Sequence, residues 1–303
     1  MPEELEPKRR TRLTRSMLLT AALAALGAST AVVAAQPGSE TIYGHDDRVE
    51  IFTLAGARAR VARDTVALVD AGSIRNNGNG TSTLLGPTLR IREDLCPGQR
   101  FASQPAIAFC SGVLLTPTVV ATAGHCVSRE TLASIRFVFD FAMQDATRAR
   151  TTLPNSRIYR ARRILARQQN DLTRNDYAVI QLDRRVTDRQ PAAFRRTGRI
   201  ATGAALYVIG HPNGLPAKLA DHASVQDNTD RVFFTANLDT FAGNSGSPVL
   251  EAATNRVAGI LSTGDPDYVG TSRGCNVVNV EPDRPGNEIV TRSTVFAPFV
   301  PVE

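Results

Sequence analysis

The sequence predicts a mostly β protein, built as a sandwich or a barrel. The first observation is a series of short runs rich in Val, Ile, Phe and Thr, a composition typical of half-buried strands. The second is turn chemistry between these runs, as at 76–80, 212–214 and 244–246. The third is the composition of the 303 residues, which are 42% hydrophobic and 21% charged. That profile excludes collagen, coiled coil and wholesale disorder, and the length suffices to bury a core.

Nine segments carry the strand pattern along the chain. We predict strands at 65–69, 112–115, 118–121, 135–139, 178–182, 205–209, 232–235, 257–261 and 294–299. Two other stretches, 192–196 and 128–135, are the candidate helices. The Asn- and Gly-rich stretch at 76–80 is predicted to be the exposed loop of a hairpin. Many short strands at such spacing favour a sandwich or a barrel.

The first 35 residues have the layout of an export signal. Residues 8–15 hold five basic side chains, and 17–35 is an uncharged stretch rich in Ala and Leu. We therefore predict a secreted, extracellular protein from which 1–35 is removed, with 36–41 as a spacer or short propeptide and no stable membrane association afterwards. The apolar stretch is near the lower length limit for spanning a bilayer, so a retained N-terminal membrane anchor is the alternative.

The net charge of +6 first suggests a nucleic-acid partner. After the signal, however, the sequence has no long basic run and no interleaving of aromatic and basic residues, so we expect a mildly basic solvated surface and no nucleic acid. The sequence also lacks a phosphate loop, a dinucleotide fingerprint and metal-ligand spacing, and we expect neither cofactor nor metal. Four cysteines permit two disulfides in an oxidising compartment.

A histidine flanked by small residues forms the first candidate motif. His125 lies in Thr-Ala-Gly-His-Cys at 122–126, and small neighbours leave room for a substrate beside its ring. Cys110 and Cys126 are 16 residues apart and could link the hairpin that presents the histidine. Closing a loop of that size gains about 3 kcal/mol in the chain-entropy account. Alone, such a histidine is more often structural.

An aspartate and a serine form the second and third motifs. Asp176 directly precedes an alternating run, where a carboxylate could be held rigidly enough to orient an imidazole. Ser245 lies in Gly-Asn-Ser-Gly-Ser-Pro at 243–248, a tight turn that could expose a nucleophile beside converging N–H groups. Either motif alone is common in turns. The three together, in the order His, Asp, Ser, are far more specific, and the order differs from that of α/β-hydrolases.

With these motifs the sequence resembles the secreted bacterial trypsin-like serine proteases of the chymotrypsin fold, and most closely the glutamyl-endopeptidase-like group. The likeness runs from about residue 42 to about residue 299. The matching pieces are Cys-Ser-Gly at 110–112, Thr-Ala-Gly-His-Cys at 122–126, Asn-Asp-Tyr-Ala-Val at 175–179, Gly-His-Pro at 210–212 and Gly-Asn-Ser-Gly-Ser-Pro at 243–248.

The resemblance implies two six-stranded antiparallel β-barrels, at 42–190 and 191–303, with the active site in the cleft between them. It implies a serine endopeptidase that acts on protein or peptide substrates through an acyl-enzyme intermediate, as a monomer. The catalytic triad would be His125, Asp176 and Ser245, with the N–H groups of Gly243 and Ser245 as the oxyanion hole. The rival interpretation is an inactive or very narrow-specificity protease-like protein that acts as a cell-surface or extracellular binding module.

The resemblance also implies where the substrate pocket lies. The candidate pocket residues are Asp239, Thr240, Ser262 and Gly264. Relatives that cleave after Arg or Lys carry an acid six residues before the nucleophile, as Asp239 stands here, and this favours Arg or Lys before the cut. Thr240 matches the glutamate-cleaving group, but the histidine of that group is replaced here by Leu261 or Ser262, so Glu and broader preferences stay as alternatives.

Two further features follow from the comparison with this family. By exclusion, Cys96 and Cys275 would form the second disulfide, with free thiols or another pairing left open. Asn244 stands where animal digestive relatives carry an acid that receives the freed N-terminal amine. An activation switch of that type is therefore not expected, and the mature N-terminus is expected near Thr41 or Ile42.

Overall fold

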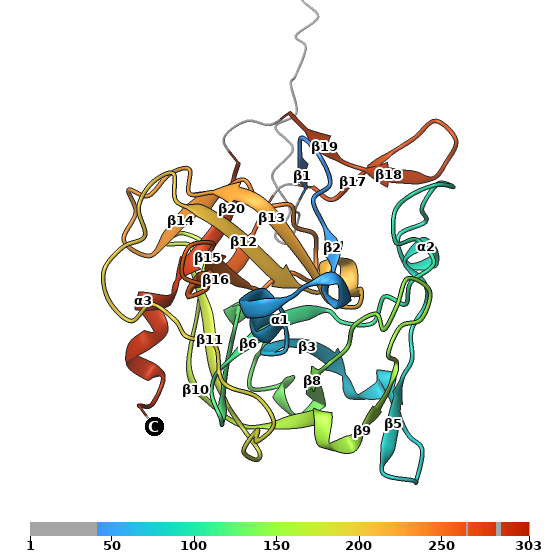
Figure 1. Cartoon of the computed structure of the whole chain (residues 1–303), viewed down its shortest axis with the longest axis horizontal. Helices are drawn as coiled ribbons and strands as arrows, with labels where there is room; N and C mark the ends of the chain where they lie inside the picture. The colour runs from blue at the N-terminus through green and yellow to red at the C-terminus, as the bar shows by residue number, and fades with distance from the viewer. Residues whose placement is uncertain (1–40, 265, 283–285, 303) are drawn as a thin grey trace, which may run out of the picture. The chain divides into compact units, whose positions relative to one another are not determined.

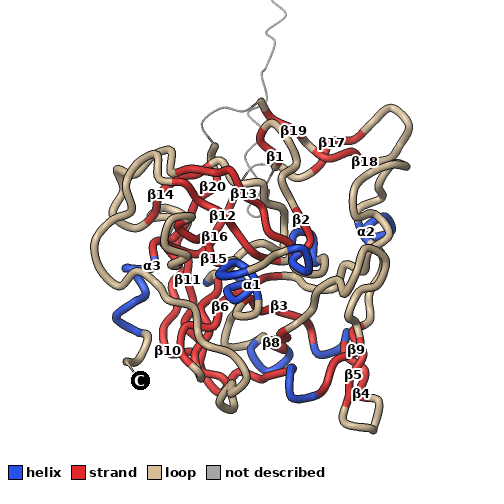
Figure 2. Tube along the Cα trace, viewed as in Figure 1, coloured by secondary structure: helices blue, strands red, loops and turns tan. Residues whose placement is uncertain are grey.

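Residues 41–264, 266–282 and 286–302 are described by the computed structural model of the chain. The predicted export signal at 1–35 lies outside the described residues. Within the described ranges, no helix is long and apolar enough to cross a membrane. The architecture is mostly β, which confirms the fold class predicted from the sequence (Figures 1 and 2).

Six strands between residues 65 and 182 close into an antiparallel barrel, in the order β10-β11-β7-β6-β3-β8. They are β3 (Thr65–Asp70), β6 (Cys110–Thr116), β7 (Val119–Thr122), β8 (Ile135–Phe139), β10 (Ile158–Asn170) and β11 (Asn175–Leu182). Alternate side chains such as Leu68, Val120 and Phe137 fill the barrel interior. β6 and β7 are buried at every position, because other parts of the chain cover their outer face.

Seven strands form the second large sheet, in the order β14-β20-β16-β15-β12-β13-β2. They are β2 (Val49–Glu50), β12 (Ala205–Gly210), β13 (Lys218–Ser224), β14 (Phe233–Ala236), β15 (Pro248–Glu251), β16 (Val257–Thr263) and β20 (Glu288–Arg292). A bridge between Val225 and Ala236 brings the ends of β13 and β14 together again. β12, β13, β14, β15, β16 and β20 therefore curl into a second barrel, with β2 added at the edge.

Shorter elements flank the two barrels. The remaining strands are β1 (Ile42–Tyr43), β4 (Ile74–Asn76), β5 (Thr81–Leu84), β9 (Thr152–Pro154), β17 (Tyr268–Gly270), β18 (Asn276–Val278) and β19 (Val280–Glu281). The helices are α1 (Gly56–Ala62), α2 (Leu89–Arg92) and α3 (Ser293–Phe296), with single turns η1 (Ile51–Thr53), η2 (Ala71–Ser73), η3 (Gly124–Cys126), η4 (Leu132–Ser134), η5 (Asn155–Arg157), η6 (Pro212–Gly214) and η7 (Ala297–Phe299). β4 and β5 pair around the Asn- and Gly-rich stretch, which confirms the predicted hairpin loop.

The N-terminal strands pair with the second half of the chain, although the sequence-based division placed all of 42–190 in the first barrel. β1 pairs in parallel with β19, and β2 pairs with β13. Burial explains this placement, because Thr41 is fully buried and its carbonyl accepts the N–H of Thr240. The first barrel therefore begins only at β3. The connection from β11 to β12 spans 183–204, which includes residue 190.

A third group of buried side chains joins the two barrels. Tyr177 of β11 packs with Tyr207 of β12 and with Phe296 of α3, and all three side chains are buried. The rings of Tyr177 and Phe296 lie 6.0 Å apart, within the range of favourable aromatic pairs. The C-terminal helix thereby fixes the first barrel to the second.

Eight of the nine predicted strands are present, and the ninth prediction was wrong. Residues 294–299 are helical, in α3 and η7, because helical spacing brings Phe296 and Phe299 over the ring of Tyr177. A short apolar run does not distinguish the two states by itself. The candidate helix at 192–196 was also wrong, since Phe194 bridges to Val257 in an extended backbone. Of 128–135, only η4 is helical.

Candidate active site

His125 is held at the end of the first barrel by the turn η3, which follows β7. Only glycine fits at position 124, because the Cβ of any other residue would collide with the carbonyl oxygen of Gln168 on β10. Arg167, also on β10, donates through Nε to the carbonyl oxygens of Gly124 at 2.8 Å and Val127 at 2.6 Å. Contacts from β10 thus fix the backbone that carries the imidazole.

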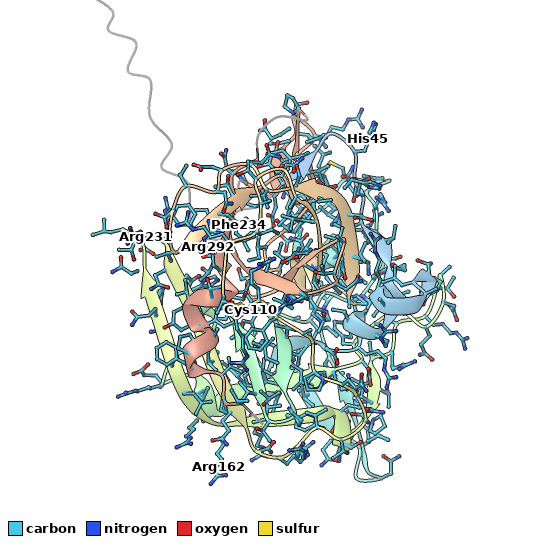
Figure 3. The ribbon with its side chains drawn as sticks, turned by 60° about the vertical axis from the view of Figure 1, so that its left-hand side comes forward. His45, Cys110, Arg162, Arg231, Phe234 and Arg292 are labelled. Atoms are coloured by element: carbon cyan, nitrogen blue, oxygen red, sulfur yellow. A yellow bond between two sulfur atoms is a disulfide. The ribbon has the colours of Figure 1, made fainter. Side chains whose placement is uncertain are left out.

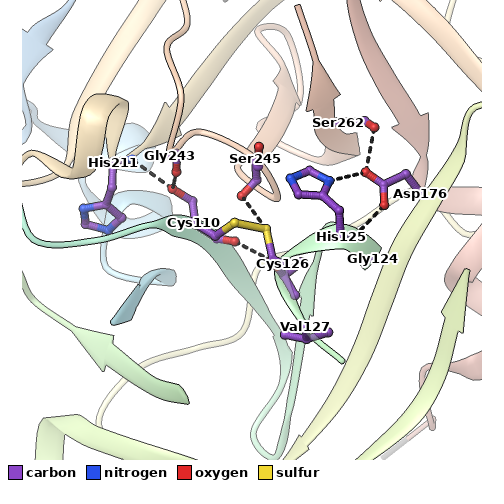
Figure 4. The surroundings of a disulfide bond; sticks show 12 residues. Cys110, Gly124, His125, Cys126, Val127, Asp176, His211, Gly243, Ser245 and Ser262 are labelled. Atoms are coloured by element: carbon purple, nitrogen blue, oxygen red, sulfur yellow. Dashed lines mark hydrogen bonds and ion pairs between the residues drawn. A yellow bond between two sulfur atoms is a disulfide. The ribbon is translucent and has the colours of Figure 1, made fainter. Parts of the chain in front are cut away.

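Two disulfides pair all four cysteines. Cys110 at the start of β6 is bonded to Cys126, the residue after His125, with their Cα atoms 6.2 Å apart (Figure 4). Cys96, after α2, is bonded to Cys275, before β18. The first disulfide therefore acts directly on the position of His125, and the second fixes the β17–β18 hairpin.

Asp176 is the second residue of β11, and its carboxylate is directed at the histidine turn (Figure 4). Its Oδ2 lies 2.7 Å from Nδ1 of His125, and its Oδ1 accepts the backbone N–H of His125 at 2.9 Å. Ser262 Oγ donates to Oδ2 at 2.8 Å. Because an ionised carboxylate only accepts hydrogen bonds, the imidazole proton is on Nδ1. That tautomer leaves Nε2 as a base.

The carboxylate of Asp176 keeps its charge in spite of its burial. Burial alone raises its pKa, but the hydrogen bonds and electrostatic attraction of His125, together with the Ser262 hydroxyl, outweigh this effect and hold the pKa below its usual range. A permanent negative charge beside Nδ1 stabilises an imidazolium.

Ser245 lies in the loop between β14 and β15. It lines the same cleft as His125, and this cleft has a volume of about 330 Å³. Gly243 has φ +92°, and a Cβ there would lie 2.6 Å from the carbonyl oxygen of His211. Across the described residues, the backbone N–H groups of Gly243 and Ser245 donate to no protein acceptor. Nor does any hydrogen bond join Ser245 Oγ to His125 in that part of the chain, as is common before substrate binds.

Of the four predicted pocket residues, the structure places two at or beside the cleft and two away from it. Ser262 lines the cleft, but its hydroxyl supports Asp176, and Gly264 follows the cleft residue Thr263 directly. Asp239 is 4% exposed and does not line the cleft. Its two oxygens accept the N–H groups of Tyr43 and Asp47, each at 2.8 Å, and burial raises its pKa to about 7.

Thr240, the fourth pocket candidate, is fully buried, and its N–H donates to Thr41. Its hydroxyl has no hydrogen-bond partner among the described residues. Asp239 and Thr240 therefore both support the N-terminal segment at 41–47 rather than line the cleft.

Sequence reasoning missed one wall of the cleft. The tip of the β10–β11 hairpin contributes Gln169, Asn170, Asp171 and Arg174. Their only signal in the sequence is turn chemistry, which does not indicate what the turn faces. It also missed the contact of Ser262 with Asp176, although a serine among the apolar residues of a buried strand needs a hydrogen-bond partner.

His211 is buried and stacks on Phe141, with ring centroids 5.7 Å apart. Its Nδ1 bonds the carbonyl of Leu215 at 2.9 Å, and burial lowers its pKa to about 4. It is therefore neutral, and it holds the turn between His211 and Leu215. The described residues bring three candidate metal ligands together at Cys110, His125 and Cys126, but the two sulfurs form the disulfide.

A pair of β-barrels with His, Asp and Ser side chains at one cleft defines the chymotrypsin class of folds. Residues 110–260 match the family model of the trypsin-like peptidase domain. The chain therefore has a trypsin-like peptidase domain and the fold of the bacterial serine proteases that its sequence resembles.

Solved structures with this fold include a Glu endopeptidase in complex with MPD and the VesB protease of Vibrio cholerae. The first is 17% identical with a TM-score of 0.51, and the match covers 86% of this chain and 97% of that one. The second is 16% identical with a TM-score of 0.50, over 84% of this chain and 65% of that one. No curated protein sequence is significantly similar to the chain.

Proposed function

We propose that this protein is an exported serine endopeptidase that cleaves peptide bonds through an acyl-enzyme. One observation carries the proposal. His125 Nδ1 lies 2.7 Å from Asp176 Oδ2 in the cleft that Ser245 also lines. The backbone N–H groups of Gly243 and Ser245, which donate to no acceptor among the described residues, belong to the same cleft. The proposed nucleophile, the oriented base and the proposed oxyanion donors thus line one cleft.

The proposed reaction follows from these positions. Ser245 Oγ attacks the scissile carbonyl carbon while His125 Nε2 takes the hydroxyl proton, and Asp176 stabilises the resulting imidazolium. The carbonyl oxygen becomes an oxyanion between the N–H groups of Gly243 and Ser245. His125 then gives its proton to the leaving amine. Water, deprotonated by the same histidine, releases the acyl group and restores Ser245.

Export and maturation belong to the same proposal. The two disulfides are of the kind that persists in an oxidising compartment, which fits secretion of a monomer after removal of 1–35. The burial of Thr41 and Ile42 supports a mature N-terminus near this point. An anchor retained through 17–35 is the alternative for the N-terminal segment.

A covalent probe tests the proposed function. The secreted protein is treated with an aryl sulfonyl fluoride and read by intact mass and peptide mapping. We expect one label per chain, on Ser245, on a polypeptide that begins near Thr41. A folded protein that takes no label would favour the binding-module alternative, and a labelled protein that begins at Gln36 would overturn the maturation site.

The preference for Arg or Lys before the cut was predicted from the sequence position of Asp239, and a second experiment tests it. Because both of its oxygens hold backbone N–H groups of the N-terminal segment, we expect Asp239→Asn to lower kcat/KM about equally for all peptides and to lower Tm. The measurement is a peptide panel that varies only the residue before the cut. A loss confined to Arg and Lys peptides would instead establish Asp239 as the specificity residue.

A further inference from the structure

The oxyanion hole depends on the orientation of one peptide group. A trans peptide directs its C=O and N–H to opposite sides, so Gly243 N–H faces the hole only while the Ala242 carbonyl points away from it. Glycine adopts positive and negative φ with similar ease, so the residue itself does not fix this orientation. Contacts from elsewhere must hold the Ala242–Gly243 peptide.

Two residues outside the nucleophile loop supply those contacts. The backbone N–H of Asn213 donates to the Ala242 carbonyl at 2.5 Å. The N–H of Ala242 donates to Asp267, at 3.0 Å from Oδ2. Asn213 Nδ2 in turn donates to the same Oδ2 of Asp267 at 2.8 Å, which closes a ring of hydrogen bonds around Ala242. We call this ring the Asp267–Asn213 bridge.

The bridge is itself supported by Tyr268, the first residue of β17. Tyr268 OH donates to Asn213 Oδ1 at 2.8 Å, and the ring of Tyr268 packs on Phe241, with centroids 5.8 Å apart. Asn213 has φ +49°, a left-handed conformation that asparagine tolerates better than most residues. Burial raises the pKa of Asp267 to about 7, so this carboxyl is placed there at a cost in free energy.

The residue before the nucleophile does not take over this task. Asn244 is neutral, and its Oδ1 accepts the Ser247 hydroxyl at 3.2 Å. On the other side of the glycine, Ser111 Oγ donates to the Gly243 carbonyl at 2.7 Å and accepts the N–H of His211 at 2.9 Å. The peptides before and after Gly243 are therefore both fixed by residues distant in sequence.

On the basis of the proposed function, we infer that Asp267 and Asn213 are positioning residues that hold the Ala242–Gly243 peptide with its N–H in the oxyanion hole. Without the bridge the peptide can turn over, which removes one donor and places a carbonyl oxygen where the oxyanion must form. The effect falls on the transition state and not on substrate binding, so it appears in kcat and not in KM.

The test compares the kinetic constants of the Asp267→Asn variant with those of the unsubstituted mature enzyme. The asparagine keeps the shape but sets its NH2 group against a donor. We expect kcat to fall about 100- to 1000-fold, the usual loss of one hole donor, with KM changed less than about threefold. The inhibition constant of a peptide aldehyde, whose adduct places an oxyanion in the hole, should rise in parallel. Asp227→Asn is the matched control, because Asp227 also accepts a backbone N–H, that of Thr229, in an exposed turn.

Tyr268→Phe is the second variant, and it keeps the experiment decisive if Asp267→Asn does not fold. It removes only the hydroxyl that supports Asn213, and we expect a smaller loss of about 3- to 10-fold, the effect of one hydrogen bond, again in kcat. Unchanged kcat in folded variants, or a loss confined to KM, would overturn the inference while the parent enzyme still cleaves and labels. A parent that neither cleaves nor labels would instead refute the proposed function.

Discussion

A Ser245→Ala variant should lose kcat on the order of a millionfold, because removal of a catalytic serine disables the whole triad. The residual rate, about 1000- to 10000-fold above that in water, would come from the oxyanion hole and from substrate binding. The measurement is peptide hydrolysis at saturating substrate, with the sulfonyl fluoride label as a second readout. Activity within a hundredfold of the parent would identify a contaminating protease or another nucleophile.

The same variant should keep its fold, which separates chemistry from stability. The loop around Ser245 is held by its backbone, since the N–H of Ser111 donates to the Ser245 carbonyl at 2.8 Å and Gly246 N–H donates to Leu261. Neither bond involves the side-chain hydroxyl. We therefore expect an unchanged Tm, and a large decrease would attribute the lost activity to unfolding.

An Asp176→Asn variant should lower kcat about 10000-fold, the loss measured when this change leaves a triad in the wrong tautomer. The asparagine carbonyl can still accept the backbone N–H of His125 in place of Oδ1. Its NH2 group then faces Nδ1, so the imidazole moves its proton to Nε2 and is no longer a base towards Ser245. Single-turnover kinetics of acylation measures this step directly.

A Ser262→Ala variant should show a smaller loss of kcat than Asp176→Asn. It removes one donor to Asp176 Oδ2 but leaves the carboxylate and the histidine contact in place. A hydrogen bond to a charged group is worth about 1.5–3 kcal/mol, so the expected loss is about 10- to 100-fold. If Asp176→Asn cost no more than Ser262→Ala, the carboxylate would not orient the base.

The contiguous motifs made much of this site predictable from the sequence. His125 and Ser245 are surrounded by the small residues that their turns require, and Asp176 begins a regular strand, so local pattern and role coincide. Asp239 differs, because a count of six residues does not say whether a carboxylate faces a cleft or the N-terminal segment. Asp267 and Asn213 are 54 residues apart, and only the tertiary structure reveals that they meet at Ala242.

The fold was predictable where apolar residues mark strands, and less so where charge obscures them. β10 was not predicted, because arginines occupy its outward positions, and Arg162 projects away from the ribbon in Figure 3. Such long charged side chains hide the alternating apolar pattern by which a strand is recognised, although the inner face of the strand is apolar. The C-terminal run at 294–299 was wrongly assigned for the opposite reason, since it is apolar on every side and gives no period.

The contacts of Asp176 make enzymatic activity a measure of how the two halves of the molecule are joined. Its carboxylate is bonded to His125 of the first barrel and to Ser262 of the second, and its backbone carbonyl accepts the Thr291 hydroxyl of β20 at 3.0 Å. A shift of one barrel against the other breaks the hydrogen bonds to Ser262 and Thr291, while each barrel keeps its own hydrogen bonding. Inactivation can thus precede the loss of secondary structure, and a chain damaged at this joint would stop cutting before it becomes a substrate for its neighbours.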